Sequence, residues 1–420
     1  MTLPQHIPIR RAPATVPYLD KLMPAAGFHK VVWPLAVAET IVWAGLYYSF
    51  PALLLQWEAD PGWSKAELTG AFTLSVLVSA LLAPFSGRVI DRALGPHLFA
   101  GSAAIGAVLL MVLTQVTQLW QFYAVWTAIG VVMAGCLYEP CFALLTRTMG
   151  PRARRAITAV SLVAGLAGTV SFPAAHYLSA ALGWRGALVV FAAVILGLAV
   201  PLMWYAAKLA ERSGGHQAPA SSLKAATAAR VAARPAFWAL SLGFAMLALN
   251  HGMILTHTLP LLNERGLDPA LAVLAISCIG PMQVAGRIVM MSVEHRVSSM
   301  AIAIACQVSL AVAAVALMGA AAWPVLLAPF VMLQGAGNGV TSIIRPVLTA
   351  ELLGRADFGV ISGLTALVYI SGFALGPTAG SLLWQTGGYN AMLVAAIAMT
   401  GAGIVLLAAA RRFSAAAPHG

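Results

Sequence analysis

Residues 300–321 read MAIAIACQVSLAVAAVALMGAA, and none of these 22 residues carries a charge. An α-helix rises about 1.5 Å per residue, so this stretch can cross the hydrocarbon core of a bilayer, which needs about 20 apolar residues. The whole chain of 420 residues is similarly apolar, with 60% hydrophobic and 9% charged residues. We predict twelve such spans, at residues 31–55, 66–86, 98–117, 121–146, 156–181, 187–207, 236–262, 269–291, 300–321, 324–348, 359–383 and 389–410.

The composition excludes an ordinary soluble protein, because so few charged residues could not cover the surface of so long a chain. The sequence therefore predicts an all-α membrane protein with twelve transmembrane helices. With both termini cytoplasmic, nineteen of the 24 Lys and Arg residues fall in cytoplasmic segments and three in outer segments. The positive-inside rule then predicts a multi-pass protein of the plasma membrane, the inner membrane in bacteria. The basic residues form no single patch, so nucleic-acid binding is excluded despite the net charge of +11.

Two similar halves are predicted from a polar segment in the middle of the chain and from matching residues on either side of it. Gly183 and Gly388 are about 205 residues apart, and so are Gly150 and Gly354. Parallel repeats of six spans place a solute site between them, near the bilayer midplane. The predicted parts are a cytoplasmic tail at 1–30, a six-helix bundle at 31–207, a cytoplasmic linker at 208–235, a second bundle at 236–411 and a tail at 412–420.

Regularly spaced glycines indicate where helices pack. Gly372, Gly376 and Gly380 are four residues apart, and so are Gly335 and Gly339. Small residues at this spacing let transmembrane helices approach each other closely. The glycines at 335–339 also match a nucleotide-binding fingerprint, but they lie inside an apolar span with no preceding strand, so we reject that interpretation.

Three ionisable residues lie deep inside predicted spans, where a charge costs about 2.5–3.5 kcal/mol at the bilayer centre. They are Glu39 in the first span, Glu139 in the fourth and Arg345 in the tenth. Counted along their helices, all three fall within about 10 Å of the midplane on the cytoplasmic side. Glu139-Pro140 and Arg345-Pro346 also occupy equivalent positions in the two halves. Because such residues are costly, we predict that they serve the function.

The loop between the second and third spans resembles the signature of the major facilitator superfamily. The residues from Gly87 to Arg92 read GRVIDR and match that signature, which continues with a glycine where this chain has Leu94. The fifth span, which leads to Gly-Trp-Arg at 183–185, and Tyr-Ser-Phe-Pro at 48–51 are similar to the bacterial monocarboxylate-carrier-like branch. The resemblance covers the chain from about residue 31 to 411.

This resemblance implies two pseudo-symmetric six-helix bundles that move a solute by alternating access, in a protein that works as a monomer. It also implies that Gly87, Asp91 and Arg92 form a latch between the halves on the cytoplasmic side. A carboxylate such as Asp91 is attracted to the positive ends of helix dipoles, which suits that role. The alternative is that Asp91 and Arg92 only cap helices and fix the topology.

In that superfamily, spans one, four, seven and ten line the central cavity, so the resemblance places Glu39, Glu139 and Arg345 around one vestibule. We predict that Arg345 binds an anionic solute, or Glu139 when the solute is absent, because a guanidinium matches a carboxylate and stays charged. Glu39 or Glu139 is predicted to couple protons, because burial favours a neutral carboxyl and a nearby Arg favours its ion. The alternatives are a static Glu139–Arg345 pair that joins the halves and a Glu39 that reaches the inner interface.

Polar and aromatic residues extend this predicted site. Asn338 lies seven residues before Arg345, on the same face of an otherwise apolar helix. His251 is predicted either to relay protons, because His titrates near physiological pH, or to make a hydrogen bond between helices. Arg287 could reach the cavity, although it lies close enough to the inner surface to extend there. The remaining predicted solute contacts are Trp43, Tyr47, Asn250 and Gln283.

No cofactor and no metal site is predicted. Cys136 and Cys141 lie about 140° apart around a helix, and no set of His, Cys and carboxylates has the spacing of a zinc site. Nucleotide-binding and protease motifs are also missing, so an ATP-driven pump and a membrane enzyme are excluded. The sequence predicts a secondary active transporter for a small organic solute, in particular an organic anion such as a monocarboxylate, driven by proton symport.

Three alternatives remain open. A proton-driven exporter of a toxic compound, such as a drug or an arsenical, would use the same fold, and so would a carrier of a flat vitamin-like solute; the aromatic face formed by Trp43 and Tyr47 suits both. A membrane solute sensor without transport would need a signalling domain, for which the tail and the linker are short. The predicted partners are the solute, protons and the lipid bilayer.

Overall fold

The structure is a computed structural model, described for residues 25–213, 225–354 and 358–415, and this part of the chain contains helices and no strands. Short π-helical segments at Trp43–Tyr48 and Ile195–Ala199 join α1 to α2 and α8 to α9. The helices are α1 (Ala25–Val42), α2 (Ser49–Ala59), α3 (Lys65–Asp91), α4 (Gly95–Leu113), α5 (Leu119–Cys136), α6 (Tyr138–Met149), α7 (Ala153–Ala164), α8 (Ala167–Val194), α9 (Val200–Ser213), α10 (Ala225–Ala232), α11 (Pro235–Glu264), α12 (Pro269–Ser277), α13 (Ile279–Val293), α14 (Ser299–Gly319), α15 (Leu327–Leu353) and α16 (Phe358–Ala415).

Ten helical stretches in the described residues are long and apolar enough to cross a membrane. Two of them, Ala153–Arg212 with 60 residues and Val360–Ser414 with 55, are far too long for one crossing of a hydrocarbon core of about 30 Å. Each turns back at a glycine with non-helical torsion angles, Gly183 in the first and Gly388 in the second. Each therefore provides two crossings, and the predicted total of twelve is confirmed.

The two halves turn in the same way at equivalent glycines. Gly183 has φ 71° and ψ 167°, and Gly388, 205 residues later, has φ 66° and ψ −169°. Gly150 and Gly354, the other matched pair, also have positive φ angles, 51° and 96°. A side chain is strained in this region and glycine is not, so the sequence repeat reflects a repeated backbone shape.

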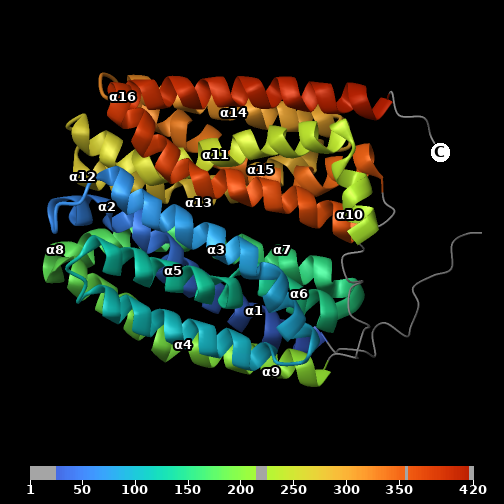
Figure 1. Ribbon diagram of the computed structural model, residues 1–420, viewed down its shortest axis with the longest axis horizontal. Coiled ribbons are helices and arrows are strands. Elements are labelled where there is room, and N and C mark those ends of the chain that lie inside the picture. The colour runs from blue at the N-terminus through green and yellow to red at the C-terminus, as the bar shows by residue number, and fades with distance from the viewer. Residues whose placement is uncertain (1–24, 214–224, 355–357, 416–420) are drawn as a thin grey trace, which may run out of the picture.

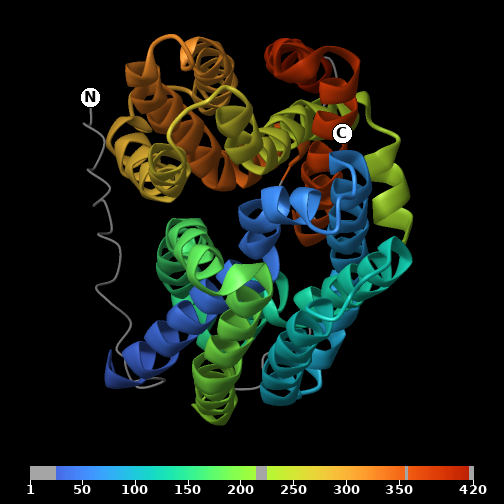
Figure 2. The same ribbon diagram turned by 90° about the vertical axis from the view of Figure 1, so that its left-hand side faces the viewer.

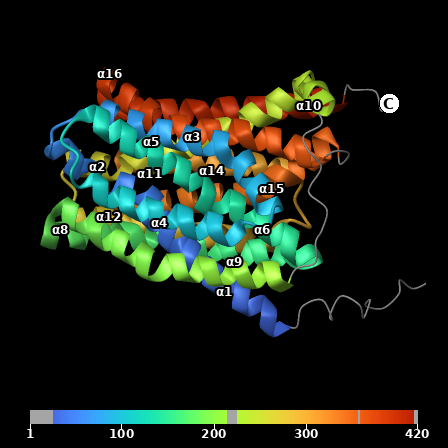
Figure 3. The same ribbon diagram turned by 60° about the horizontal axis from the view of Figure 1, so that its bottom comes forward.

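The crossings form two bundles that lie side by side, α1–α9 in one and α11–α16 in the other (Figures 1 and 2). We call the end of the molecule where α1 begins and α16 ends the terminus end, and the end where α2 meets α3 the opposite end (Figures 1 and 3). α10 lies across the terminus end, within the predicted linker 208–235 (Figure 1). The first and last helices of the first bundle extend beyond its predicted boundaries. α1 begins six residues before Val31, and α9 continues to Ser213.

Gly372, Gly376 and Gly380 bring α16 into close contact with α11. A methyl group on Gly372 would lie 2.6 Å from the Ala245 carbonyl oxygen, and one on Gly376 would lie 2.7 Å from the Leu249 carbonyl oxygen. These atoms belong to the backbone and cannot move aside. The glycine spacing is therefore confirmed as a helix-packing pattern.

The apolar core joins the two halves only toward the opposite end. The larger core cluster contains buried residues of the first half together with Leu261, Leu317 and Phe330 of the second. These three residues lie in the parts of α11, α14 and α15 that are nearest the opposite end of the molecule. The terminus end of the second half has a separate cluster that includes Leu310 and Leu348. The halves are therefore packed together at the opposite end and not at the terminus end.

Candidate functional site

A seam of hydrogen bonds between α3 and α16 closes the opposite end. The Thr69 and Ser381 hydroxyls lie 2.8 Å apart, and the Thr73 hydroxyl donates to the Ala374 carbonyl oxygen at 2.8 Å. Thr73 also lies 2.8 Å from the Thr378 hydroxyl. These contacts join the two halves, because α3 belongs to the first half and α16 to the second.

Charged groups lie at the outer edge of this seam. The Lys65 ammonium group lies 3.9 Å above the Trp384 ring and 2.7 Å from the Glu58 carboxylate. The Trp384 indole N–H donates to Glu264 at 2.9 Å. Beside the seam, Asp60 pairs with Arg185 at 2.9 Å, and this hydrogen bond lowers the pKa of Asp60.

Several crossings are interrupted between the seam and the terminus end. α5 ends at Cys136 and α6 begins at Tyr138, because the Pro140 ring clashes with the carbonyl group four residues earlier, that of Cys136. Pro281 stands in the same relation to Ser277, the last residue of α12. Broken helices at this depth are tolerated where they line a cavity, and in transporters they form solute sites.

Arg345 lies in α15, which continues as helix on both sides of it, and is half-buried. Its guanidinium carbon lies 4.3 Å from the centre of the Tyr369 ring, a cation–π contact. Its Nη1 is buried and has no hydrogen-bond partner. A guanidinium group normally fills its donors when buried, so this nitrogen has an unused donor that an acceptor can bind once the side chains that cover it move.

Glu139 is exposed although it lies within the fourth crossing. Its charge interacts with that of Arg345, which comes from the other half, so its carboxylate faces the space between the halves. No ion pair joins these two described residues. The sequence placed both residues at one vestibule; in the structure their charges interact, but no ion pair joins them.

Arg287 lies between the halves, which is one of the two positions that the sequence left open for it. Its Nε donates to the Gly339 carbonyl oxygen at 3.0 Å, and its Nη1 contacts the Ser161 carbonyl oxygen at 3.4 Å. Gly339 belongs to α15 and Ser161 to α7, so Arg287 lies between the halves instead of extending to the membrane surface. It adds a second cation to the cleft.

Aromatic side chains form much of the cleft wall. Trp43 and Tyr138 lie 4.7 Å apart between ring centres, and Tyr47 stacks on Phe373 at 5.8 Å with an interplanar angle of 13°. Trp43 and Tyr47, which the sequence predicted as solute contacts, are therefore grouped together. Tyr138, Tyr369 and Phe373 were not singled out, although Tyr138 is next to Glu139 in the sequence.

Glu39 lies beneath this aromatic wall and is completely buried. Neither of its carboxylate oxygens has a hydrogen-bond partner that meets normal geometry, and its polar neighbours are Trp43, Cys141 and Glu139. An uncompensated buried carboxylate is costly, which favours a carboxyl that carries a proton in this conformation. Glu39 does not extend to the interface at the terminus end.

Two thiols lie near Glu39. Cys136 and Cys141 are free and buried. Among the described residues, no group of three His, Cys, Asp or Glu side chains is placed to hold a metal ion.

Two predicted residues of α11 pack against neighbouring helices. His251 Nδ1 lies 3.3 Å from the Gln334 amide nitrogen, which is the interhelical hydrogen bond that the sequence offered as one of two roles. Asn250 is completely buried and donates to the Ala396 carbonyl oxygen at 3.1 Å. Asn250 thus faces α16, and in this conformation it lies outside the cleft.

Asn338 lies in α15, the helix that carries Arg345, and Gln283 lies in the adjacent helix α13. Asn338 is partly exposed, and its carbonyl oxygen has no hydrogen-bond partner. Gln283 is buried where α13 packs against Gly339 of α15. Asn338 therefore remains a candidate solute contact, whereas Gln283 packs between α13 and α15.

The three residues of the predicted latch lie at the terminus end, where α3 ends. The side chains of Asp91 and Arg92 are exposed, and a methyl group on Gly87 would touch nothing. The Asp91 carboxylate has no ion pair with another described residue. It is available to a different partner when the halves move.

The turn that carries Asp91 is held by the first half itself. Arg147 donates to the Ile90 carbonyl oxygen and lies 3.7 Å from Glu211, which accepts a hydrogen bond from the Gly95 backbone N–H at 3.0 Å. This network fixes the turn independently of Asp91.

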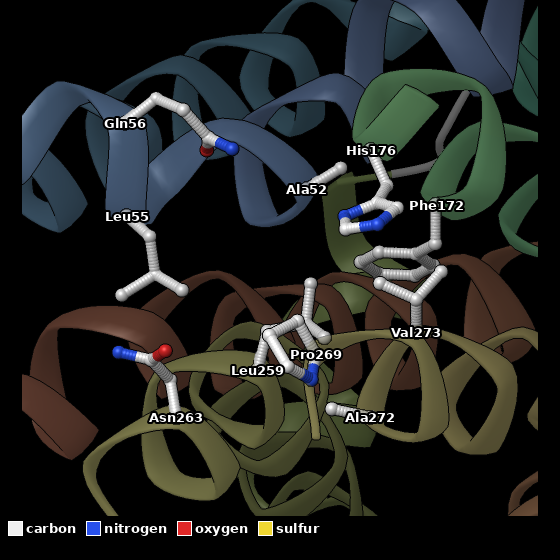
Figure 4. A pocket seen from close by; sticks show the side chains of 10 residues that line it. All are labelled: Ala52, Leu55, Gln56, Phe172, His176, Leu259, Asn263, Pro269, Ala272 and Val273. Atoms are coloured by element: carbon white, nitrogen blue, oxygen red, sulfur yellow. The ribbon is translucent and has the colours of Figure 1, made fainter. Parts of the chain in front are cut away.

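A small cavity of about 60 Å³ lies between the halves near the opposite end. Figure 4 shows His176 and Phe172 side by side at one side of it, with Gln56 and Asn263 at the other. The remaining lining is apolar and comes from α2, α11 and α12. The cavity contains none of the predicted site residues and is separate from the charged cleft.

Comparison with protein families decides the class. The sequence profile of the Major Facilitator Superfamily matches residues 35–318, which is more than half of the chain. The chain belongs to the major facilitator superfamily. A major facilitator protein is a transporter and not an enzyme, so this chain moves a small-molecule solute across a lipid bilayer. No curated protein matches the sequence significantly.

Solved major facilitator structures share the fold. A bacterial homologue of the human lysosomal transporter Spinster, inward-facing and unoccupied, is 16% identical with a TM-score of 0.66; the match covers 93% of this chain and 97% of that one. A mutant of the nucleoside transporter NupG is 15% identical with a TM-score of 0.71, over 92% of this chain and 99% of that one. At this identity, these structures support the fold and not a shared substrate.

Proposed function

We propose that this major facilitator protein carries a small organic anion, such as a monocarboxylate, by alternating access. The observation that supports the anion is Arg345, a half-buried cation with a buried Nη1 that has no partner. Arg287 adds positive charge nearby, and the nearest acid, Glu139, is not paired with Arg345. The resemblance of residues 183–185 to the monocarboxylate-carrier-like branch supports the same substrate class.

We further propose that both termini are cytoplasmic and that the protein resides in the plasma membrane as a monomer. The Lys and Arg residues are concentrated in the segments at the terminus end, as the positive-inside rule requires. In this orientation the seam closes the outer side, and the cleft opens to the cytoplasm.

The test of the proposed function is uptake by purified protein in proteoliposomes, with and without an imposed pH gradient. Accumulation of a monocarboxylate above its equilibrium level, only when the gradient is present, is the result we expect. Saturable binding without flux would indicate a sensor instead. Efflux of cationic drugs without uptake of any carboxylate would indicate the exporter.

Proton coupling is proposed to run through Glu39, with Glu139 as its neighbour in the cleft. We expect Glu39→Gln to abolish accumulation driven by a pH gradient, because an amide cannot release a proton. Exchange of internal for external solute should persist within about threefold, because it requires no net proton movement. Normal gradient-driven accumulation by this variant would remove Glu39 from the coupling path.

Asp91 is proposed to act as a latch rather than as a solute ligand. We expect Asp91→Asn to slow turnover about tenfold with a KM within about twofold of the original, because the carboxylate helps only to close the cytoplasmic side. Initial rates of uptake over a range of solute concentrations separate the two effects. An unchanged turnover would leave Asp91 with no role beyond topology.

A further inference from the structure

The aromatic rings near the cations are partly exposed, although they lie deep within the molecule. Trp43, Tyr48, Tyr138, Tyr369 and Phe373 are each partly accessible. Side chains that face lipid would also be accessible, but the rings of the first half contact one another, and one contact reaches Phe373 of the second half. Tyr138 lies 4.7 Å from Trp43, and Tyr47 links this group to Phe373 in the second half. The exposed faces of these rings therefore line the cleft.

The same rings surround the two cations. The Arg345 guanidinium lies over Tyr369 at 4.3 Å. Arg287 lies near the hydroxyl groups of Tyr48, Tyr138 and Tyr369. The cleft thus presents positive charge and flat apolar faces to one entering molecule, and the faces come from both halves.

The tyrosines also offer polar groups at the edges of their rings. None of the hydroxyls of Tyr48, Tyr138 and Tyr369 makes a hydrogen bond with another described residue, and none is among the buried groups without a partner. These hydroxyls are therefore open to water in the cleft. They can bond to substituents on a solute or to its second carboxylate oxygen.

We propose that the transported anion is a planar aromatic carboxylate. Its carboxylate would bind the free Nη1 of Arg345, and its ring would stack against the faces of Trp43, Tyr138 and Tyr369. Aromatic pairs gain attraction beyond the burial of their area, so a flat ring fits this wall better than a puckered aliphatic ring of equal size. The inference rests on the proposed function, since it assumes that Arg345 holds the anion.

A neutral flat solute fits the cleft less well than an acid. It would occupy the rings but leave the Arg345 guanidinium without an anion, and a desolvated unpaired charge is costly. A short aliphatic acid would satisfy Arg345 but leave the aromatic faces in contact with water. Only a solute with both a carboxylate and a flat ring uses the whole site.

The test compares benzoate with cyclohexanecarboxylate, which has the same charge and a similar size but a puckered ring, and with neutral benzamide. Binding to purified full-length protein is measured by isothermal titration calorimetry, and competition is measured by uptake in proteoliposomes. We expect benzoate to bind at least about fivefold more tightly than cyclohexanecarboxylate, and benzamide to bind more weakly than both.

Variants assign the preference to the aromatic wall. Tyr369→Leu and Trp43→Leu should lower benzoate affinity at least about fivefold and change cyclohexanecarboxylate affinity less than about twofold. Tyr369→Phe, which keeps the ring, should retain the preference. Tyr177→Leu is the matched control, because Tyr177 is 67% exposed on the outer surface of α8. Size-exclusion profiles show whether each variant is folded. If the leucine variants are not folded, the affinities of Tyr369→Phe show whether the ring carries the preference for benzoate.

The outcomes separate the two proposals. Equal affinity for benzoate and cyclohexanecarboxylate would overturn the aromatic inference and leave the anion carrier intact. Binding of benzamide as tight as that of benzoate, or no binding of either acid, would overturn both the inference and the proposed function.

Discussion

Replacing Arg345 with glutamine is expected to lower carboxylate uptake at least about a hundredfold while folded protein remains in the membrane. The variant loses a charge-assisted hydrogen bond from a half-buried site, and a hundredfold loss corresponds to about 2.7 kcal/mol, within the range for such bonds. Initial rates in proteoliposomes measure the effect. Arg345→Lys should recover only part of the activity, because an ammonium keeps the charge but cannot bind a carboxylate through two parallel N–H groups.

The matched control for this substitution is Arg296→Gln, at an exposed position in the turn between α13 and α14. It removes the same charge from the terminus end without touching the cleft, and uptake should stay within about twofold. Normal uptake by Arg345→Gln would exclude Arg345 as the anion ligand. Equal losses in the two variants would point to a general effect of charge on membrane insertion.

Gly376→Leu is expected to destabilise the second bundle by at least about 2 kcal/mol and to reduce the yield of monodisperse protein sharply. The new side chain would meet the Leu249 carbonyl oxygen at 2.7 Å and the Met253 backbone nitrogen at 2.6 Å, and neither atom can yield without moving α11. Thermal unfolding in detergent, followed by size-exclusion chromatography, measures the change.

Gly401→Leu provides the control on the same long helix, because a side chain there would touch nothing within 4 Å. Its midpoint of thermal unfolding should match that of the original protein, or exceed it slightly, since leucine favours helix more than glycine does. Similar loss of stability in both variants would mean that helix propensity, and not the close contact between α11 and α16, explains the effect.

The topology could be predicted from sequence because the bilayer constrains it so strongly. Every crossing must be apolar and satisfy its own backbone hydrogen bonds, so a run such as residues 300–321 must form a transmembrane helix. The turn at Gly183 and its repeat at Gly388 could be predicted for a similar reason, since both positions need a conformation that only glycine adopts without strain. Close helix contacts at Gly372 and Gly376 followed from their spacing.

The composition of the cleft was less predictable, because the period of a helix gives its faces but not the neighbour that each face meets. Asn250 was assigned to the solute, yet it bonds to Ala396, because α11 is packed on nearly all sides. Counting along a straight helix left two positions open for Arg287, the cavity and the inner surface. The break between α12 and α13 and the long side chain bring its guanidinium to Gly339 and Ser161.

The aromatic wall escaped the sequence analysis for another reason. Tyr138 and Tyr369 belong to different halves, and nothing in their local sequence indicates that they face the same cations. Packing of α15 against α16 brings the Tyr369 ring under Arg345, and the approach of the other bundle brings Tyr138 to the same side. Residues such as these depend on tertiary packing rather than on hydropathy or spacing.

The position of Arg345 and Arg287 at a water-filled cleft between the halves is tested by thiol labelling at Ser342. This residue is exposed and lies three positions before Arg345, on the same side of α15. In a cysteine-free background, Ser342→Cys should react with a membrane-impermeant maleimide added on the cytoplasmic side, and benzoate should slow the reaction several-fold. Val405→Cys, 68% exposed in the middle of a crossing, should react only with a membrane-permeant reagent. Ser342→Cys that behaves like Val405→Cys would contradict the account.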